Sequence, residues 1–142
     1  MRILISACLL GEACRYDGAS KGLPQEKLEA LMRKHTLIPV CPEQLGGLPT
    51  PRTPSERQGA CVVMRDGTDV TAEYDRGARI ACALAAQTLA EAALLKARSP
   101  SCGSGEIYDG TFTGTLTPGD GVTAERLKTL GIPVYTEETF PF

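Results

Sequence analysis

The sequence predicts an α/β fold, a three-layer, Rossmann-like domain with a mostly parallel sheet and helices on both faces. Short apolar runs typical of buried strands alternate along the chain with longer segments of helical composition, and this alternation favours parallel sheets. The 142 residues suffice for one domain of ordinary size, and no repeat or linker divides them. We therefore expect residues 1–142 to form a single domain.

The first part of the chain predicts two strands on either side of a helix. Arg2–Ser6 is a short apolar run and predicts a buried strand, and the glycine-containing segment Gly11–Gly22 predicts a loop. Pro24–Lys34 places leucines at helical spacing after a proline that suits a first helical turn. Thr36–Val40 predicts the next strand, although Pro39 disfavours a central place in a sheet.

A long loop, a strand and a turn are expected next. Pro42–Gly59 contains four prolines and three glycines, so it predicts a loop without regular structure, and such long loops are usually functional or disordered. Ala60–Met64 predicts a strand. Asp66-Gly67 is a strong hairpin turn, after which Thr68–Val70 is expected to return along that strand.

The last part of the chain predicts two helices that alternate with two strands. Thr71 is a candidate cap for a helix over Ala72–Ala92, which is rich in good helix formers, and Ala93–Lys96 predicts a short strand. Turn residues then predict a loop, and a second segment rich in glycine and threonine predicts a loop or a ragged hairpin. A helix that ends before Gly131 and a final strand complete the chain. The ranges are loops at Arg98–Gly105 and Asp109–Gly121, a helix at Val122–Leu130 and a strand at Pro133–Tyr135.

Composition excludes several classes of protein. Hydrophobic residues make up 42% and charged residues 23%, which is ordinary for a globular chain. The net charge of −2 argues against a protein that binds a nucleic-acid polymer. No apolar run approaches the length of a membrane span, and the start lacks the parts of a signal peptide. We therefore expect a cytoplasmic protein, and the sequence leaves its oligomeric state open.

Six cysteines are many for a chain of this length. None forms a CxxC pair, so zinc-finger and thioredoxin spacings are absent. Cys8, Cys41 and Cys102 each follow closely on a predicted strand. If those strands are parallel, the three thiols lie at the same edge of the sheet, where ligands bind in such folds.

Three thiols that converge in this way leave several interpretations open. Soft thiolates select zinc, copper(I) or iron–sulfur clusters, and three widely spaced cysteines suit a cluster with one open iron. The alternative is that these cysteines pack as small hydrophobic residues. We expect Cys61 and Cys82 to do so. Cys14 could be a substitute ligand, a redox partner or a bystander, and we favour a bystander.

The residues around these thiols resemble a known family. Ser6–Gly18 reads SACLLGEACRYDG, Val40–Pro54 reads VCPEQLGGLPTPRTP, and Ala97–Gly105 reads ARSPSCGSG. Together these strings resemble a bacterial domain-of-unknown-function family that includes the thiouracil desulfidases, in its short form without a second domain. The resemblance extends from Ile3 to about Tyr135.

The resemblance implies a non-redox desulfuration of a thiolated nucleobase, such as 2-thiouracil, to the oxo base. It implies a 4Fe-4S cluster held by Cys8, Cys41 and Cys102, whose open iron binds the substrate sulfur and which can be lost in air. It further implies an acidic residue and a serine beside the open iron, which match Glu43 and Ser101. Glu43 would then accept a proton from water and later deliver one to the leaving fragment.

Four further residues are candidates for binding the substrate: Ser99, Arg15, Asp17 and Arg52. Arg15, Asp17 and Arg52 can instead form ion pairs that order the two loops, or an arginine can contact an anionic part of the substrate, such as a nucleotide phosphate. Three other functions stay open: a cluster enzyme with another substrate, a non-enzymatic sulfur- or metal-binding carrier, and a thiol-only or zinc protein. Turnover separates an enzyme from a carrier.

Overall fold

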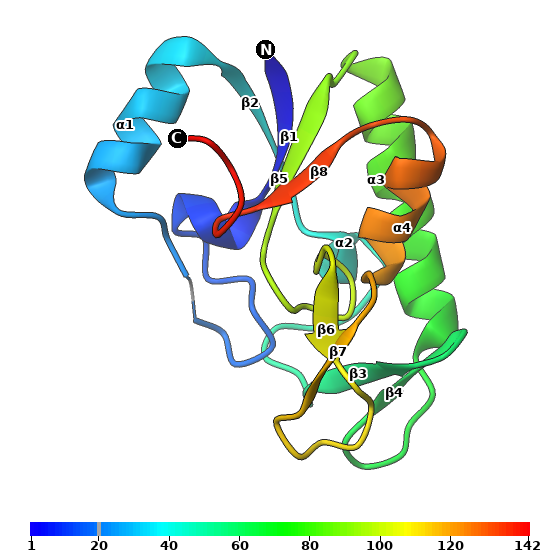
Figure 1. The fold of residues 1–142 in the computed structure, drawn as a ribbon. Coiled ribbons are helices and arrows are strands. Elements are labelled where there is room, and N and C mark those ends of the chain that lie inside the picture. Colours follow the sequence, from blue (N-terminus) through cyan, green and yellow to red (C-terminus); the bar gives the residue numbers. More distant parts are fainter. Residues whose placement is uncertain (20) are drawn as a thin grey trace.

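The protein contains a four-stranded parallel sheet, as the sequence predicts, in a computed structural model that describes residues 1–19 and 21–142. The strand order is β2-β1-β5-β8, and every neighbouring pair in this sheet is parallel (Figure 1). The strands are β1 (Arg2–Ser6), β2 (Thr36–Val40), β5 (Ala92–Leu95) and β8 (Val134–Thr136). β2 lies at an edge of the sheet, which agrees with the place expected for a strand that contains Pro39.

Helices cover both faces of the sheet, which confirms the three layers. Successive side chains of a strand point to opposite faces. Ile3 and Ile5 therefore pack with Leu31 of α1 (Gln25–Lys34), whereas Leu4 packs on the other face with Ala81 of α3 (Thr71–Gln87). α4 (Val122–Thr129) joins α3 on that second face. Each fully buried Ile or Leu contributes roughly 1.5–3 kcal/mol to folding.

The order of the strands creates a switch point beside β1. The chain leaves β1 through α1 to form β2 on one side, and it later passes through α3 to form β5 on the other side. Connections that diverge in this way open a crevice at the carboxyl ends of the two central strands. β1 runs directly into a 3-10 helix, η1 (Ala7–Leu10), and this helix carries Cys8 to the crevice.

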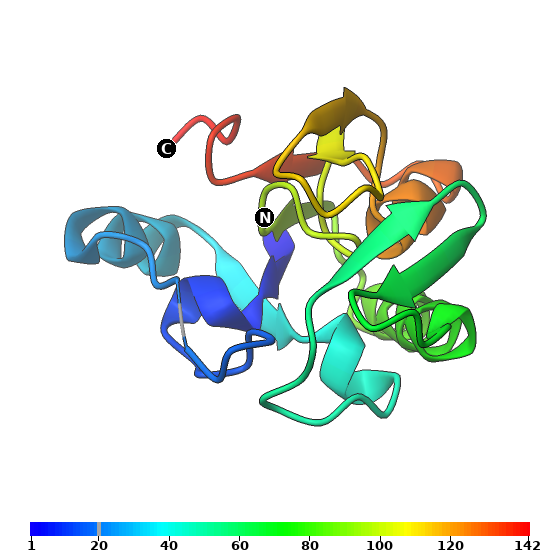
Figure 2. The ribbon, with the colours of Figure 1, turned by 90° about the horizontal axis from the view of Figure 1, so that it is seen from below.

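The expectation that Pro42–Gly59 lacks regular structure is wrong. Pro42 starts a short helix, α2 (Pro42–Leu45), because a proline is tolerated in a first helical turn. β3 (Ser55–Gln58) then forms an antiparallel hairpin with β4 (Cys61–Met64). A second hairpin joins β6 (Glu106–Tyr108) to β7 (Leu116–Pro118), the latter within the predicted ragged hairpin. Both hairpins lie beyond the carboxyl ends of the sheet (Figures 1 and 2).

Two glycines bring α2 against α3. A Cβ atom on Gly77 of α3 would lie 1.9 Å from the carbonyl oxygen of Pro42, and one on Gly46 would lie 2.0 Å from that of Glu73. These separations leave no room for a side chain, so glycine is required where the two backbones meet. The contact fixes the position of α2, and with it the position of Glu43.

Several predicted boundaries differ from the observed ones. α3 ends at Gln87 rather than at Ala92, and the Thr88 hydroxyl after it donates to the carbonyl of Leu84. β5 begins at Ala92, one residue earlier than predicted. Thr71 begins the helix without capping it, because its hydroxyl contacts the backbone of Val62. Asp66-Gly67 forms a turn, but only one bridge, between Val63 and Asp69, returns along β4.

Among the described residues, no helix has both the length and the apolar character that a membrane span needs.

Candidate functional site

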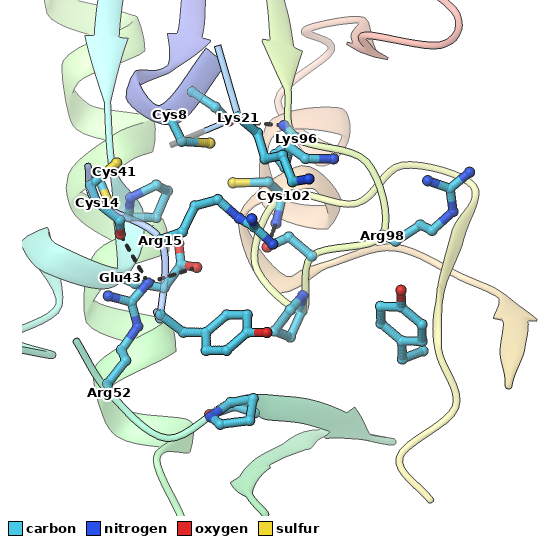
Figure 3. A pocket seen from close by; sticks show the side chains of 18 of the residues that line it. Cys8, Cys14, Arg15, Lys21, Cys41, Glu43, Arg52, Lys96, Arg98 and Cys102 are labelled. Atoms are coloured by element: carbon cyan, nitrogen blue, oxygen red, sulfur yellow. Dashed lines mark hydrogen bonds and ion pairs between the residues drawn. The ribbon is translucent and has the colours of Figure 1, made fainter. Parts of the chain in front are cut away.

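A cavity of about 590 Å³ opens beyond the carboxyl ends of β1, β2 and β5 (Figure 3). Its walls come from η1 and the loop after it, from α2, from the loop after β5 and from the two hairpins. This volume falls within the range of about 300–1,000 Å³ that is typical of sites for small molecules. The cavity lies at the switch point, where the topology places ligands in folds of this kind.

The three predicted thiols line this cavity. Cys8 lies on η1, Cys41 stands immediately before α2 at the end of β2, and Cys102 lies in the loop after β5. Cys8 and Cys102 are buried, and Cys41 is half-buried. The parallel sheet therefore brings together three thiols that are far apart in the sequence, as the spacing predicts.

Burial keeps these thiols protonated while they are free. Burial, together with a smaller effect of the nearby Glu43 carboxylate, raises the pKa of Cys8 and that of Cys41 to about 12. The pKa of Cys102 is also raised well above its ordinary value, first by burial and then by the charge of Glu43. A coordinating metal ion deprotonates a thiol outright, and its positive charge stabilises the buried thiolate. Thiolates are soft ligands, so this donor set fits a soft metal centre.

The described side chains form no site for a single metal ion. Among the described residues, no three Cys, His, Asp or Glu side chains are close enough to hold one ion. A zinc site gathers its thiolates at about 2.3 Å from one atom. A 4Fe-4S cluster instead binds its thiolates on separate irons and so needs a wider arrangement.

Glu43, on the first turn of α2, is a carboxylate whose charge acts on all three thiols. Its side chain lines the cavity and is 15% exposed. Arg52 Nη2 lies 3.4 Å from Glu43 Oε2, and the Arg52 side chain is only 3% exposed. Burial raises the pKa of Glu43, while the Arg52 guanidinium opposes the rise.

Arg52 connects the loop that carries Cys14 to α2, which carries Glu43. Besides contacting Glu43, its Nη2 donates to the carbonyl oxygen of Cys14 at 3.3 Å, and its Nη1 donates to Thr50 and Pro49. The ordering role considered for Arg52 agrees with these contacts. Cys14 is buried in the cavity wall beside Cys41, whose Sγ lies 3.8 Å from the Cys14 carbonyl oxygen.

The two serines that flank Pro100 differ in position. The Ser99 hydroxyl lines the cavity and accepts hydrogen bonds from the backbone N–H groups of Ser101 and Cys102 at 3.1 and 3.0 Å. Ser101 is 0% exposed, lies outside the cavity wall and is hydrogen-bonded to Thr123 Oγ1 at 2.8 Å. The expected place of Ser101 beside the reacting atoms therefore disagrees with its geometry, because its side chain points into the core beneath α4.

The other two candidate binding residues also differ in position. Arg15 lines the cavity and lies 3.8 Å from Asp17, so the two form a weak pair within one loop. Asp17 is exposed and is not part of the cavity wall. Arg15 therefore lies in the cavity wall, whereas Asp17 lies outside it as the partner of Arg15.

Several wall residues were not predicted as parts of the site. Lys96 directly follows β5, and its Nζ pairs with Glu137 Oε2 at 2.5 Å. Its position at the carboxyl end of a central strand was a usable signal, because the same rule identifies Cys8. No comparable signal in the sequence pointed to six further wall residues, which tertiary folding brings to the cavity: Tyr16, Arg65, Tyr74, Arg98, Tyr108 and Phe112.

Comparisons with known proteins are consistent with this site. A family model described as 2-thiouracil desulfurase matches residues 3–139. The uncharacterized protein YbbK of Bacillus subtilis (strain 168) is 43% identical in an alignment of 145 positions that covers 95% of each chain. A solved structure described as the 4Fe-4S-dependent thiouracil desulfidase TudS is 51% identical, with a TM-score of 0.94. That match covers 99% of this chain and 93% of the other.

Proposed function

The chain belongs to the 2-thiouracil desulfurase family, and from this premise we propose that it is an enzyme that removes sulfur from a thiolated pyrimidine without net oxidation or reduction. Cys8, Cys41 and Cys102 would hold a 4Fe-4S cluster of the kind on which the similar desulfidase depends. The observation that carries the proposal is the convergence of these three thiols with the carboxylate of Glu43 on a single cavity. The overall reaction exchanges the thiocarbonyl sulfur for the oxygen of water and releases hydrogen sulfide.

The cluster and the chain have separate tasks in this reaction. When bound, a cluster with an open iron supplies a soft Lewis acid that polarises a carbon–sulfur double bond. Glu43 accepts a proton from the attacking water and returns one to the departing sulfur. Arg52 holds the Glu43 carboxylate in place through its contact at 3.4 Å.

Ser99, rather than Ser101, supplies the hydroxyl in the cavity. Its oxygen accepts hydrogen bonds from two backbone N–H groups, and its own proton can be donated to the substrate.

We expect Ser99→Ala to lower kcat/KM by roughly tenfold or more, the value of one lost hydrogen bond. Ser101→Ala is the matched control: it leaves Thr123 unpaired in the core, so it lowers the Tm by several degrees and spares turnover. Steady-state kinetics at equal iron content, with thermal melts, separate the two, and the reverse pattern would assign the role to Ser101.

The remaining cavity wall suits a base that carries a phosphate. Tyr16, Tyr108 and Phe112 offer aromatic faces on which a pyrimidine can stack. Arg15 and Lys96 both act on the thiol of Cys8, and the backbone N–H of Lys21 donates to the Cys8 carbonyl. Figure 3 shows the side chains of these three cations extending into the cavity near Cys102. We therefore infer that the preferred substrate is a thiouridine 5′-monophosphate, because the free base has no anionic group for these cations.

Substrate comparison tests this assignment. We expect a higher kcat/KM for thiouridine 5′-monophosphate than for 2-thiouracil, whether the sulfur is at position 2 or 4. Lys21→Met should raise the KM of the nucleotide by roughly tenfold, since a charge-assisted hydrogen bond contributes about 1.5–3 kcal/mol, and should leave the KM of the free base unchanged. Lys27→Met, on the exposed part of α1, is the control. Equal KM changes for both substrates would exclude the phosphate contact, and one sulfide per chain without turnover would indicate a carrier.

A further inference from the structure

Cys14 is a buried thiol that the proposed reaction does not use. It contacts the side chain of Cys41, and Cys41 Sγ also lies 3.8 Å from the Cys14 carbonyl oxygen. Figure 3 shows the two side chains next to each other on the same wall of the cavity. They are 27 positions apart in the sequence, so the fold, and not the local chain, brings them together.

Two sets of contacts hold the segments that carry Cys14 and Cys41 in place. Arg52 Nη2 donates to the Cys14 carbonyl and thereby ties the Cys14 loop to α2. Cys41 stands immediately before α2, which is packed against α3 through Gly46 and Gly77. These contacts hold the Cys14 loop beside the start of α2, where Cys41 stands.

We propose that Cys14 and Cys41 form a reversible disulfide in the cluster-free protein, which makes Cys14 a redox-active residue that blocks cluster assembly. The oxidant is a low-molecular-weight disulfide such as oxidised glutathione. One thiolate attacks its sulfur–sulfur bond and releases one glutathione, and the second protein thiolate then attacks the mixed disulfide and releases the other. Two electrons pass from the cysteines to glutathione, and both cysteine protons are released. The link removes Cys41 from the ligand set and shields it from irreversible oxidation.

Burial and cluster binding limit when this reaction occurs. Cys14 is buried and Cys41 is half-buried, so a disulfide reagent reaches them slowly. A bound cluster occupies the Cys41 sulfur and prevents the reaction. The inference rests on the proposed function only in taking Cys41 as a cluster ligand.

Peptide mapping tests the disulfide directly. The full-length, cluster-free chain is incubated anaerobically with oxidised glutathione, its free thiols are alkylated, and it is digested with trypsin and a glutamate-specific protease. Glu12 lies between Cys8 and Cys14, so the second protease separates their peptides. We expect a cross-link between the peptides of Cys14 and Cys41, which dithiothreitol reverses. Exposed Cys61 should carry only glutathione and reports that the oxidant acted. Alkylation of both Cys14 and Cys41, or a link from Cys8, would overturn the proposal.

Iron binding tests the consequence. Oxidised wild-type protein should take up iron and sulfide only at background level, and full uptake should return after reduction. Cys14→Ser should take up iron to the same extent before and after the treatment. If reduced wild-type protein itself takes up no iron, the proposed cluster is wrong, whereas the peptide map still decides the disulfide. Uptake by oxidised wild-type protein equal to that of the reduced protein would show that no block exists.

Discussion

Replacing Cys8, Cys41 or Cys102 with serine is expected to abolish cluster binding and turnover. Anaerobically reconstituted wild-type protein should contain about four irons and four acid-labile sulfides per chain, with the absorption of a 4Fe-4S cluster. Each of these cysteines comes from a different segment of the chain, and each is expected to bind a separate iron. Turnover should fall to background in each variant, since the cluster supplies the Lewis acid.

Cys61→Ser and Cys82→Ser are matched controls for this experiment. Cys61 is exposed on β4 and Cys82 lies on α3, and neither lines the cavity. Both variants should keep the full iron content. Iron retained in the three ligand variants, or a colourless wild-type protein that binds zinc stoichiometrically, would favour the thiol-only or zinc interpretation over the cluster.

The general position of the site was predictable because it depends on topology. Short buried strands determine a parallel sheet, and such a sheet gathers the residues that follow its strands at one edge. Cys8 and Cys41 follow neighbouring strands, and this alone places their thiols together. Lys96 follows the next strand and obeys the same rule.

The walls of the cavity were not predictable, because they depend on tertiary contacts. β3 reads SERQ and has no apolar alternation, yet it forms a strand because it pairs with β4. Glu56 within it accepts the backbone N–H groups of Gly110 and Phe112, which ties one hairpin to the other. Such contacts between distant segments leave no periodic pattern in the sequence.

The side-chain directions of Ser99 and Ser101 could not be predicted from the sequence either. Both serines adjoin Pro100 in a turn, where serine is common for local hydrogen bonding. Their directions differ only because α4 packs behind the loop and the Thr123 hydroxyl is hydrogen-bonded to that of Ser101. A motif match therefore identified the segment that carries the hydroxyl but not the residue that faces the cavity.

The second large effect is expected from Glu43→Gln, which should lower kcat by roughly 10²- to 10⁴-fold, the usual contribution of a general acid–base group. Glutamine has the same shape and keeps an oxygen that can accept from Arg52, so α2 and the cavity wall should remain in place. The iron content and the visible spectrum should therefore match those of the wild type. The measurement is single-turnover and steady-state desulfuration at equal cluster content.

Two further variants separate proton transfer from charge and position. Glu12→Gln removes an exposed carboxylate from the loop of Cys8, outside the cavity wall, and should leave kcat unchanged. Glu43→Asp keeps the carboxylate but withdraws it by one methylene, so its activity should lie between those of the wild type and of Glu43→Gln. Full turnover of Glu43→Gln with an intact cluster would contradict the proton-transfer role.

Because Arg52 is anchored by Thr50 and by the Pro49 and Cys14 carbonyls, its position does not depend on Glu43. A loss of turnover in Glu43→Gln would then arise from the missing carboxylate itself, and not from a collapse of the loops around it.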